Sequence, residues 1–250
     1  MFTPRIALAS LSGESDAAWA RAVEDHAGAA FLGGIALDDA ARDAAREIVR
    51  DRDRNEFLPT DPYAFMDEQL AALDDAPLRP GFNVRSSTAE PVRRAAAICA
   101  DHDAVIEINA HCRQAELCDA GCGQTLLRDA DRLCTYVRTA SETGTAVSVK
   151  VRTEVAGVDL PTTARRLDEA GADIVHVDAM DSEGVVADIA DATDAFVVAN
   201  NGVRDRETAV EYLEYGADAV SVGRPSDDSE VLSRVRTAVE DWFSASAVQS

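Results

Sequence analysis

The residues best suited to chemistry lie together between positions 104 and 129. An alternating run, Val105-Ile106-Glu107-Ile108, has the length of one strand, and Asn109, His111 and Cys112 follow it directly. The loops that leave the strands of α/β proteins commonly carry the active site. A strand that ends in a loop with asparagine, histidine and cysteine therefore marks the place where we expect the chemistry of this chain.

The basic residues single out one further position. The chain has 24 of them, and all except Lys150 are arginine. Lysine carries a compact ammonium group, whereas arginine carries a wider guanidinium that is always charged. Either Lys150 has a role that arginine cannot fill, or it is a surface lysine left by chance.

Eight strand-like segments alternate with helical patterns along the chain. The strands are expected at 6–9, 29–35, 79–84, 104–109, 146–151, 174–178, 196–200 and 219–222. One of the helices is expected to run from Leu126 to about Ser141, behind the Cys112 loop. Eight such units predict an α/β fold, a single (β/α)8 TIM barrel that spans residues 1–250 as one domain. The alternative is a doubly wound open sheet, but no G-x-G-x-x-G motif follows the first strand.

In a barrel of this class, the functional residues sit at the carboxyl ends of the strands. The sequence places candidates at six of these ends: Asn83, Asn109, Cys112, Lys150, Arg152, His176, Asn201, Gly202, Gly223 and Arg224. The last four indicate a phosphate site, because glycines let backbone N–H groups approach an anion and arginine adds a charged fork. They fall at strands seven and eight, where such barrels commonly bind phosphate.

The order and spacing of these motifs resemble the dihydrouridine synthase family. The matching pieces are Asn109-x-x-Cys112, Gly121-x-Gly123, Val149-Lys150-Val151-Arg152, Val175-His176, Asn201-Gly202 and Val222-Gly223-Arg224. The match runs from about Asn83 to Arg224 and is strongest across residues 105–152. The resemblance implies an FMN-dependent barrel, distantly related to dihydroorotate dehydrogenases.

The resemblance also implies which residues hold the flavin. Lys150 and His176 match residues that contact the isoalloxazine ring, and Asn83 falls near a further flavin contact. The FMN phosphate would lie at Asn201, Gly202, Gly223 and Arg224. A cation beside the flavin carbonyl edge stabilises the reduced ring, which suits the lone lysine.

On the substrate side, Cys112 matches the cysteine that protonates the pyrimidine while the C5=C6 bond of a uracil ring is reduced. Asn109 and Arg152 are placed as substrate-binding residues. The implied partners are NAD(P)H or another reductant as electron donor, and tRNA as the macromolecule that carries the uracil. No metal site is expected, because the spacing of Cys112, Cys118 and Cys122 fits no ordinary zinc pattern.

The chain also departs from the family pattern. His111-Cys112-Arg113 stands where the family has Gly-Cys-Pro, and Val203 stands where it has aspartate. Only 26 residues follow Arg224, so the C-terminal tRNA-binding helical domain of the family is expected to be absent. Two alternatives therefore stay open. One is a flavin barrel that acts on a dihydropyrimidine- or dihydroorotate-like small molecule, and the other is a barrel that binds phosphate ligands without redox chemistry.

Charge and composition narrow the cellular setting. The formal net charge is −22, with 46 acidic residues spread along the chain, as on a halophilic protein surface. This charge disfavours an RNA partner, although molar salt screens the repulsion to a Debye length of ~3 Å. No apolar run is long enough to span a membrane, no signal peptide is recognised, and the odd number of cysteines suits a reducing compartment. A cytoplasmic protein is expected.

Overall fold

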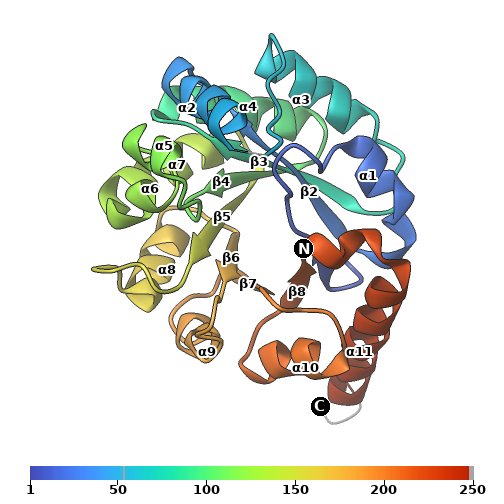
Figure 1. Ribbon diagram of the computed structural model, residues 1–250. Helices are drawn as coiled ribbons and strands as arrows, with labels where there is room; N and C mark the ends of the chain where they lie inside the picture. Colours follow the sequence, from blue (N-terminus) through green and yellow to red (C-terminus); the bar gives the residue numbers. More distant parts are fainter. Residues whose placement is uncertain (53, 248–250) are drawn as a thin grey trace.

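The computed structural model describes residues 1–52 and 54–247, and eight parallel strands form its closed barrel. The strands follow one another around the barrel in sequence order, and helices form the outer ring (Figure 1). They are β1 (Ile6–Leu8), β2 (Ala29–Ala36), β3 (Arg79–Arg85), β4 (Val105–Asn109), β5 (Ala146–Arg152), β6 (Ile174–Asp178), β7 (Phe196–Asn200) and β8 (Ala219–Val222). The predicted (β/α)8 barrel is confirmed, and no strand boundary differs from its expected position by more than one residue.

Aspartates at the junctions between strands and helices define where many helices begin. The helices are α1 (Ala17–Ala22), α2 (Asp39–Asp51), α3 (Pro62–Ala71), α4 (Ala89–Asp101), α5 (Ala115–Asp119), α6 (Gln124–Arg128), α7 (Ala130–Ser141), α8 (Leu160–Glu169), α9 (Val185–Ala190), α10 (Arg206–Glu214) and α11 (Ser229–Ala247). The side chains of Asp38, Asp159 and Asp205 each accept a hydrogen bond from a backbone N–H in the first turn of α2, α8 and α10. Such caps satisfy N–H groups that have no partner within the helix.

The segment after β4 differs from the single helix that the sequence pattern suggested. The predicted helix from Leu126 to Ser141 is divided into α6 and α7, and α5 adds a short helix before them. The break falls at Asp129, which has non-helical backbone geometry and caps α7 by accepting a hydrogen bond from the N–H of Arg132. An N-cap residue has non-helical backbone dihedral angles, so the helix is interrupted at Asp129. The apolar pattern of the sequence nevertheless continues across this interruption.

Inside the barrel, the inward side chains change from apolar to polar along each strand. On β4 the alternate positions are Val105, Glu107 and Asn109, since successive side chains of a strand point to opposite faces. At the amino-terminal end, a buried apolar cluster fills the barrel and includes Phe31 and Val105. The polar ends of the strands therefore meet at one end of the barrel, as the fold requires for its functional face.

The outward side chains of the strands pack beneath the helices. Ile106 and Ile108 of β4 and Val175 and Val177 of β6 belong to the large buried cluster that also contains the inner faces of the helices. This apolar layer fixes the strands and so fixes the polar positions that alternate with it. Across the described ranges 1–52 and 54–247, no helix is both long and apolar enough to cross a membrane.

Candidate active site

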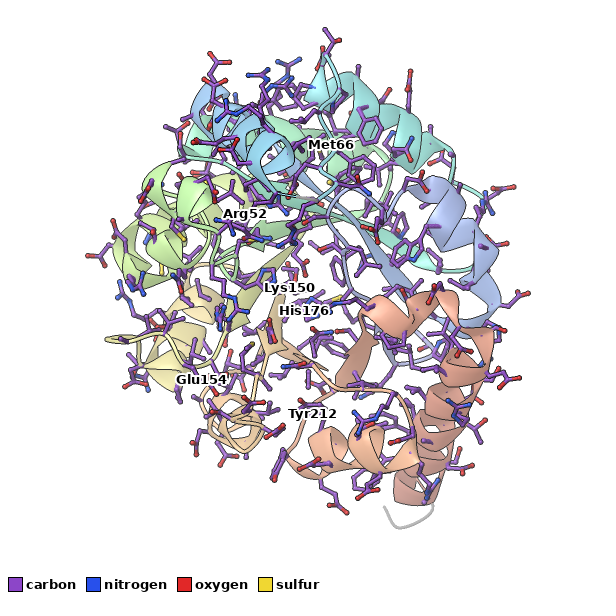
Figure 2. The ribbon with its side chains drawn as sticks, viewed as in Figure 1. Arg52, Met66, Lys150, Glu154, His176 and Tyr212 are labelled. Atoms are coloured by element: carbon purple, nitrogen blue, oxygen red, sulfur yellow. The ribbon has the colours of Figure 1, made fainter. Side chains whose placement is uncertain are left out.

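A cavity of about 640 Å³ opens at the carboxyl ends of the barrel strands. This volume lies within the range of sites for small molecules and cofactors. Eight of the ten residues singled out in the sequence line it: Asn109, Cys112, Lys150, Arg152, Asn201, Gly202, Gly223 and Arg224. Lys150 of β5 lies beside His176 of β6 near the middle of the barrel, where the two residues are register partners (Figure 2).

One side of the cavity has the features of a phosphate cradle. Gly202 has φ +69° and Asn201 has φ 108°, so the chain turns sharply after β7. The hydroxyl of Tyr212 on α10 donates to the carbonyl of Asn201 at 2.9 Å and holds this turn (Figure 2). No heavy atom lies within 4 Å of where a side chain at Gly223 would begin, and Arg224 follows it without a hydrogen-bond or ion-pair partner in the described residues. Open backbone and a free guanidinium together suit an oxyanion.

The adjoining wall of the cavity is formed by the end of β5. Lys150 is 3% exposed and Arg152 is 7% exposed, yet both line the cavity. Within the described part of the chain, neither side chain makes an ion pair, and Arg152 makes only one long hydrogen bond, to the carbonyl of Thr153 at 3.4 Å. Two nearly buried cations therefore face the cavity without a carboxylate bound to them.

Cys112 is held in place by the amide of Asn109. The Oδ1 atom of Asn109 accepts hydrogen bonds from the backbone N–H groups of Cys112, at 3.1 Å, and His111, at 3.3 Å. The carbonyl of Cys112 in turn accepts from the N–H of Gln124 at 2.8 Å. Gly123 has φ +57°, and a Cβ atom there would lie 2.3 Å from that carbonyl oxygen, so only glycine fits. Cys112 is 6% exposed and lines the cavity.

A buried ion pair lies at the cavity at the end of β3. Arg85 pairs with Glu56 and also donates to the hydroxyl of Ser12. Both side chains of the ion pair are at most 2% exposed. Burial alone would lower the pKa of Arg85, but the neighbouring Cys112 and Glu56 raise it, so the guanidinium stays charged near the thiol. Neither Arg85 nor Glu56 was predicted as a site residue from the sequence. Glu56 lies in the irregular connection between α2 and α3, 29 positions before Arg85, and no local pattern links the two.

Glu107 is the centre of a buried polar network beneath the cavity. Its carboxylate accepts from Asn83 at 2.8 Å and Ser148 at 3.1 Å, and it lies 2.7 Å from Nδ1 of His176. Burial would raise the pKa of Glu107, but His176 and Lys150 outweigh burial and lower it, so the group is ionised. Glu107 had not been identified as a site residue, although a single acid inside an apolar strand was a visible signal.

Asn83 and His176 belong to this network and do not line the cavity. Both are fully buried. Asn83 accepts from the amide of Asn109 at 2.9 Å, and Nε2 of His176 lies 2.7 Å from the hydroxyl of Ser221. Asn109 and Ser221 do line the cavity, so Asn83 and His176 reach it through these two neighbours.

Two histidines at the site are neutral. Burial and the charge of Lys150 lower the pKa of both His176 and His111, in the case of His111 well below its usual range. Because a carboxylate only accepts hydrogen bonds, Nδ1 of His176 carries the proton toward Glu107 and Nε2 accepts from Ser221. His111 lines the cavity next to Cys112 and had not been assigned a role from the sequence.

The cysteines of the loop form no recognisable metal centre. Cys112 and Cys122 are buried in one small apolar cluster with Leu117. Burial raises the pKa of Cys122 to about 12, which keeps it a thiol at neutral pH. In the residues that the structure describes, no group of three or more His, Cys, Asp or Glu side chains is arranged to hold a metal ion.

Comparison with known proteins adds a family match over most of the chain. The family model for dihydrouridine synthase matches residues 74–247. An uncharacterized protein of Methanocaldococcus jannaschii is 28% identical over 233 residues, which cover 88% of each chain. The matched residues contain the Cys112 loop, Lys150 and the phosphate cradle.

Solved structures resemble this chain in fold. Morphinone reductase in complex with tetrahydroNAD has a TM-score of 0.66 at 14% identity and covers 94% of this chain and 87% of its own. The 3-hexulose-6-phosphate synthase of Salmonella typhimurium has a TM-score of 0.57 at 16% identity, with 95% and 99% covered. A chain of the tryptophan synthase complex of Pyrococcus furiosus has a TM-score of 0.57 at 15% identity, with 98% and 100% covered. At such identities the likeness concerns the barrel alone.

Proposed function

Because the chain belongs to the dihydrouridine synthase family, an oxidoreductase family, we propose that it is an FMN-dependent reductase of the C5=C6 bond of a uracil ring. The observation that carries this proposal is that Cys112, Lys150 and the phosphate cradle line one cavity. A general acid, a cation and an anion site are the parts that a flavin reductase of this type needs. NAD(P)H or a similar reductant would supply the electrons.

The cavity has features that fit FMN. The turn at Gly202 and the open backbone at Gly223 leave room for a phosphate, and Arg224 has no protein partner there among the described residues. Lys150 is almost buried without a carboxylate bound to it, which leaves a positive charge that a ligand can neutralise. Asn201, Gly202, Gly223 and Arg224 would hold the phosphate, and Lys150 would face the ring. Bound FMN would supply hydride transfer.

The residues of the chain then have separate roles. Cys112 delivers the proton to the substrate carbon, and Asn109 fixes the position of the Cys112 backbone through its Oδ1 atom. Lys150 provides positive charge next to the ring and is held in a nearly dry environment, where charge interactions are strong. Asn83 and His176 position Asn109 and Ser221, and we assign them to the support of the cofactor site from below.

The test begins with the purified protein and its visible spectrum. We expect bound FMN, which a reductant bleaches and a uracil-type acceptor restores. Cys112→Ala should keep the flavin and its reduction, because the side chain is not part of the phosphate cradle. It should transfer electrons to the acceptor about 10²–10⁴-fold more slowly, as when a general acid is removed.

Cys99→Ala is the matched control, since Cys99 is a buried cysteine of α4 that does not line the cavity. It should behave like the parent protein. A protein that neither contains nor binds flavin would contradict the proposal and favour a phosphate-binding barrel without redox chemistry. Equal acceptor rates for the two alanine variants would remove Cys112 from the mechanism.

A further inference from the structure

The cavity is strongly cationic although the protein is strongly acidic. Its lining contains one acid, Asp178, and the following seven basic residues: Arg54, Arg85, Arg113, Lys150, Arg152, Arg204 and Arg224. The whole chain carries a formal charge of −22. The cavity lining is therefore basic in a protein whose overall charge is strongly negative, which indicates an anionic ligand.

Two arginines at the cavity differ from those on the outer surface, because they do not pair with an acid. Outer arginines commonly pair with a neighbouring acid, as in Arg52–Glu116, Arg79–Asp103 and Arg236–Glu240. Within the described ranges, the side chains of Arg54 and Arg113 have neither an ion pair nor a hydrogen bond. Both are exposed at the cavity, in a protein that offers carboxylates almost everywhere else. Their charge is left for a ligand.

These two arginines lie across the cavity from the phosphate cradle. Arg113 follows β4, whereas Arg224 follows β8, and in a closed barrel of eight strands in sequence order these strands are on opposite sides. Arg54 belongs to the connection after α2, which the ion pair of Arg52 with Glu116 fastens to α5 next to the Cys112 loop (Figure 2). A flavin with one phosphate can occupy only one of the two sides. The other side is free for the anionic group of a second molecule.

The loops around the cavity set a limit on the size of that molecule. Exposed acids lie in the loops that leave β1, β5, β6 and β8, namely Glu14, Glu154, Asp181 and Asp227. These loops surround the carboxyl face of the barrel. At this face the backbone of a nucleic acid would meet carboxylates as well as arginines, whereas a small anion needs only the arginines of the cavity.

We propose that the substrate is a small pyrimidine that bears its own phosphate or carboxylate group, bound by Arg113 and Arg54 so that the ring lies near Cys112. The inference rests on the proposed function and names its substrate class. The shared chemistry is one anionic substituent on a uracil ring. Hydride from the reduced flavin would carry both electrons to one carbon of the C=C bond. The thiol of Cys112 would give its proton to the other carbon and be left as a thiolate, which solvent reprotonates.

The test compares acceptors that differ in charge and size. Reduced protein is offered uridine, uridine 5′-monophosphate, uracil-6-carboxylate and an unmodified tRNA transcript, at low salt and at molar salt. We expect kcat/KM for one of the two anionic small molecules to exceed that for uridine at least tenfold. A higher kcat/KM for uridine 5′-monophosphate would indicate a phosphate on the substrate, and a higher kcat/KM for uracil-6-carboxylate would indicate a carboxylate.

Variants then connect the preference to the residues. Arg113→Gln combined with Arg54→Gln should lower kcat/KM for the preferred anion by about 10- to 100-fold, the loss expected when charge-assisted contacts are removed, and should lower kcat/KM for uridine far less. The control is Arg128→Gln combined with Arg138→Gln, which removes the same two charges at exposed positions of α6 and α7, outside the cavity. Its kcat/KM values should match those of the parent.

Three results would overturn the inference. These are equal turnover of uridine and both anions, a preference for tRNA at both salt concentrations, and an anion preference that survives in the double variant. Calorimetric titration with uridine 5′-monophosphate and uracil-6-carboxylate separates this inference from the proposed function. If the protein binds no flavin but binds one of the anions through Arg113 and Arg54, the anion site stands and the flavin chemistry fails.

Discussion

The Nδ1 atom of His176 lies 2.7 Å from Oε2 of Glu107, and both side chains are completely buried inside the barrel. The pair joins β4 to β6 and, through Ser221, to β8. An ionised acid and a neutral imidazole thus share one hydrogen bond directly beneath the cavity. Because every neighbour of the carboxylate can donate a hydrogen bond to it, the buried charge is well satisfied.

Glu107→Gln tests the importance of this charge. The glutamine NH2 group would face Asn83, Ser148 or His176, and at least one donor would meet another donor. We expect the free energy of unfolding in urea to fall by about 1–3 kcal/mol, the cost of an unsatisfied buried polar group. Glu240→Gln changes an exposed ion pair and should shift it by no more than about 0.5 kcal/mol. Similar values for both variants would mean that the network adds no stability.

The neutral histidine His111 predicts a loss of stability in acid. Its pKa is lowered in the native state, so between that value and about 6.5 only the unfolded state binds the proton. The free energy of unfolding therefore falls as the pH falls below about 6.5. His111→Asn should flatten this dependence by up to about 1.4 kcal/mol per pH unit, measured by urea unfolding from pH 8 to pH 5.

His102 gives the opposite sign and serves as the control. Burial would lower its pKa, but Asp67 and Asp74 raise it, so its stabilising contribution is complete below about pH 6.5 and is lost as the pH rises through the native pKa. His102→Asn should destabilise the protein more at pH 5 than at pH 8. If both histidine variants changed the pH dependence in the same direction, the assignment of a neutral His111 would be wrong.

Lys150→Arg tests the lone lysine. Because Lys150 is 3% exposed at the cavity wall, the wider guanidinium has to displace its neighbours or intrude where the ring would lie. We expect weaker FMN binding and slower flavin reduction, measured by fluorescence titration and stopped-flow absorbance. Arg152→Lys makes the reverse exchange on the same strand and supplies the comparison. Unchanged binding and reduction in Lys150→Arg would make the lysine an accident of composition.

Arg224→Ala tests the phosphate cradle. Removal of one charge-assisted contact should weaken FMN binding by about 1.5–3 kcal/mol without affecting the fold, since the described residues give its side chain no partner. Riboflavin, which lacks the phosphate, should bind both proteins equally. Equal loss of FMN and riboflavin affinity would indicate that Arg224 contacts the ring and not the phosphate.

The amino-acid sequence by itself determined the barrel and identified eight of the residues that line the cavity. Strand and helix periods are local, and aspartate or glycine marks their ends, so the eight units could be recognised one at a time. The carboxyl ends of parallel strands must meet, which placed Cys112, Lys150 and Arg224 at one site without coordinates. The break at Asp129 was missed because the apolar period of α6 and α7 continues through it.

Only the tertiary structure decided which polar residues meet beneath and beside that site. Glu107 and His176 are 69 positions apart, and Arg85 and Glu56 are 29 apart, with no local pattern that connects them. Arg54 reaches the cavity from an irregular connection that carries neither a strand nor a helix period. Secondary structure follows from neighbours along the chain, whereas buried charges find their partners through closure of the barrel, and that depends on all eight strands at once.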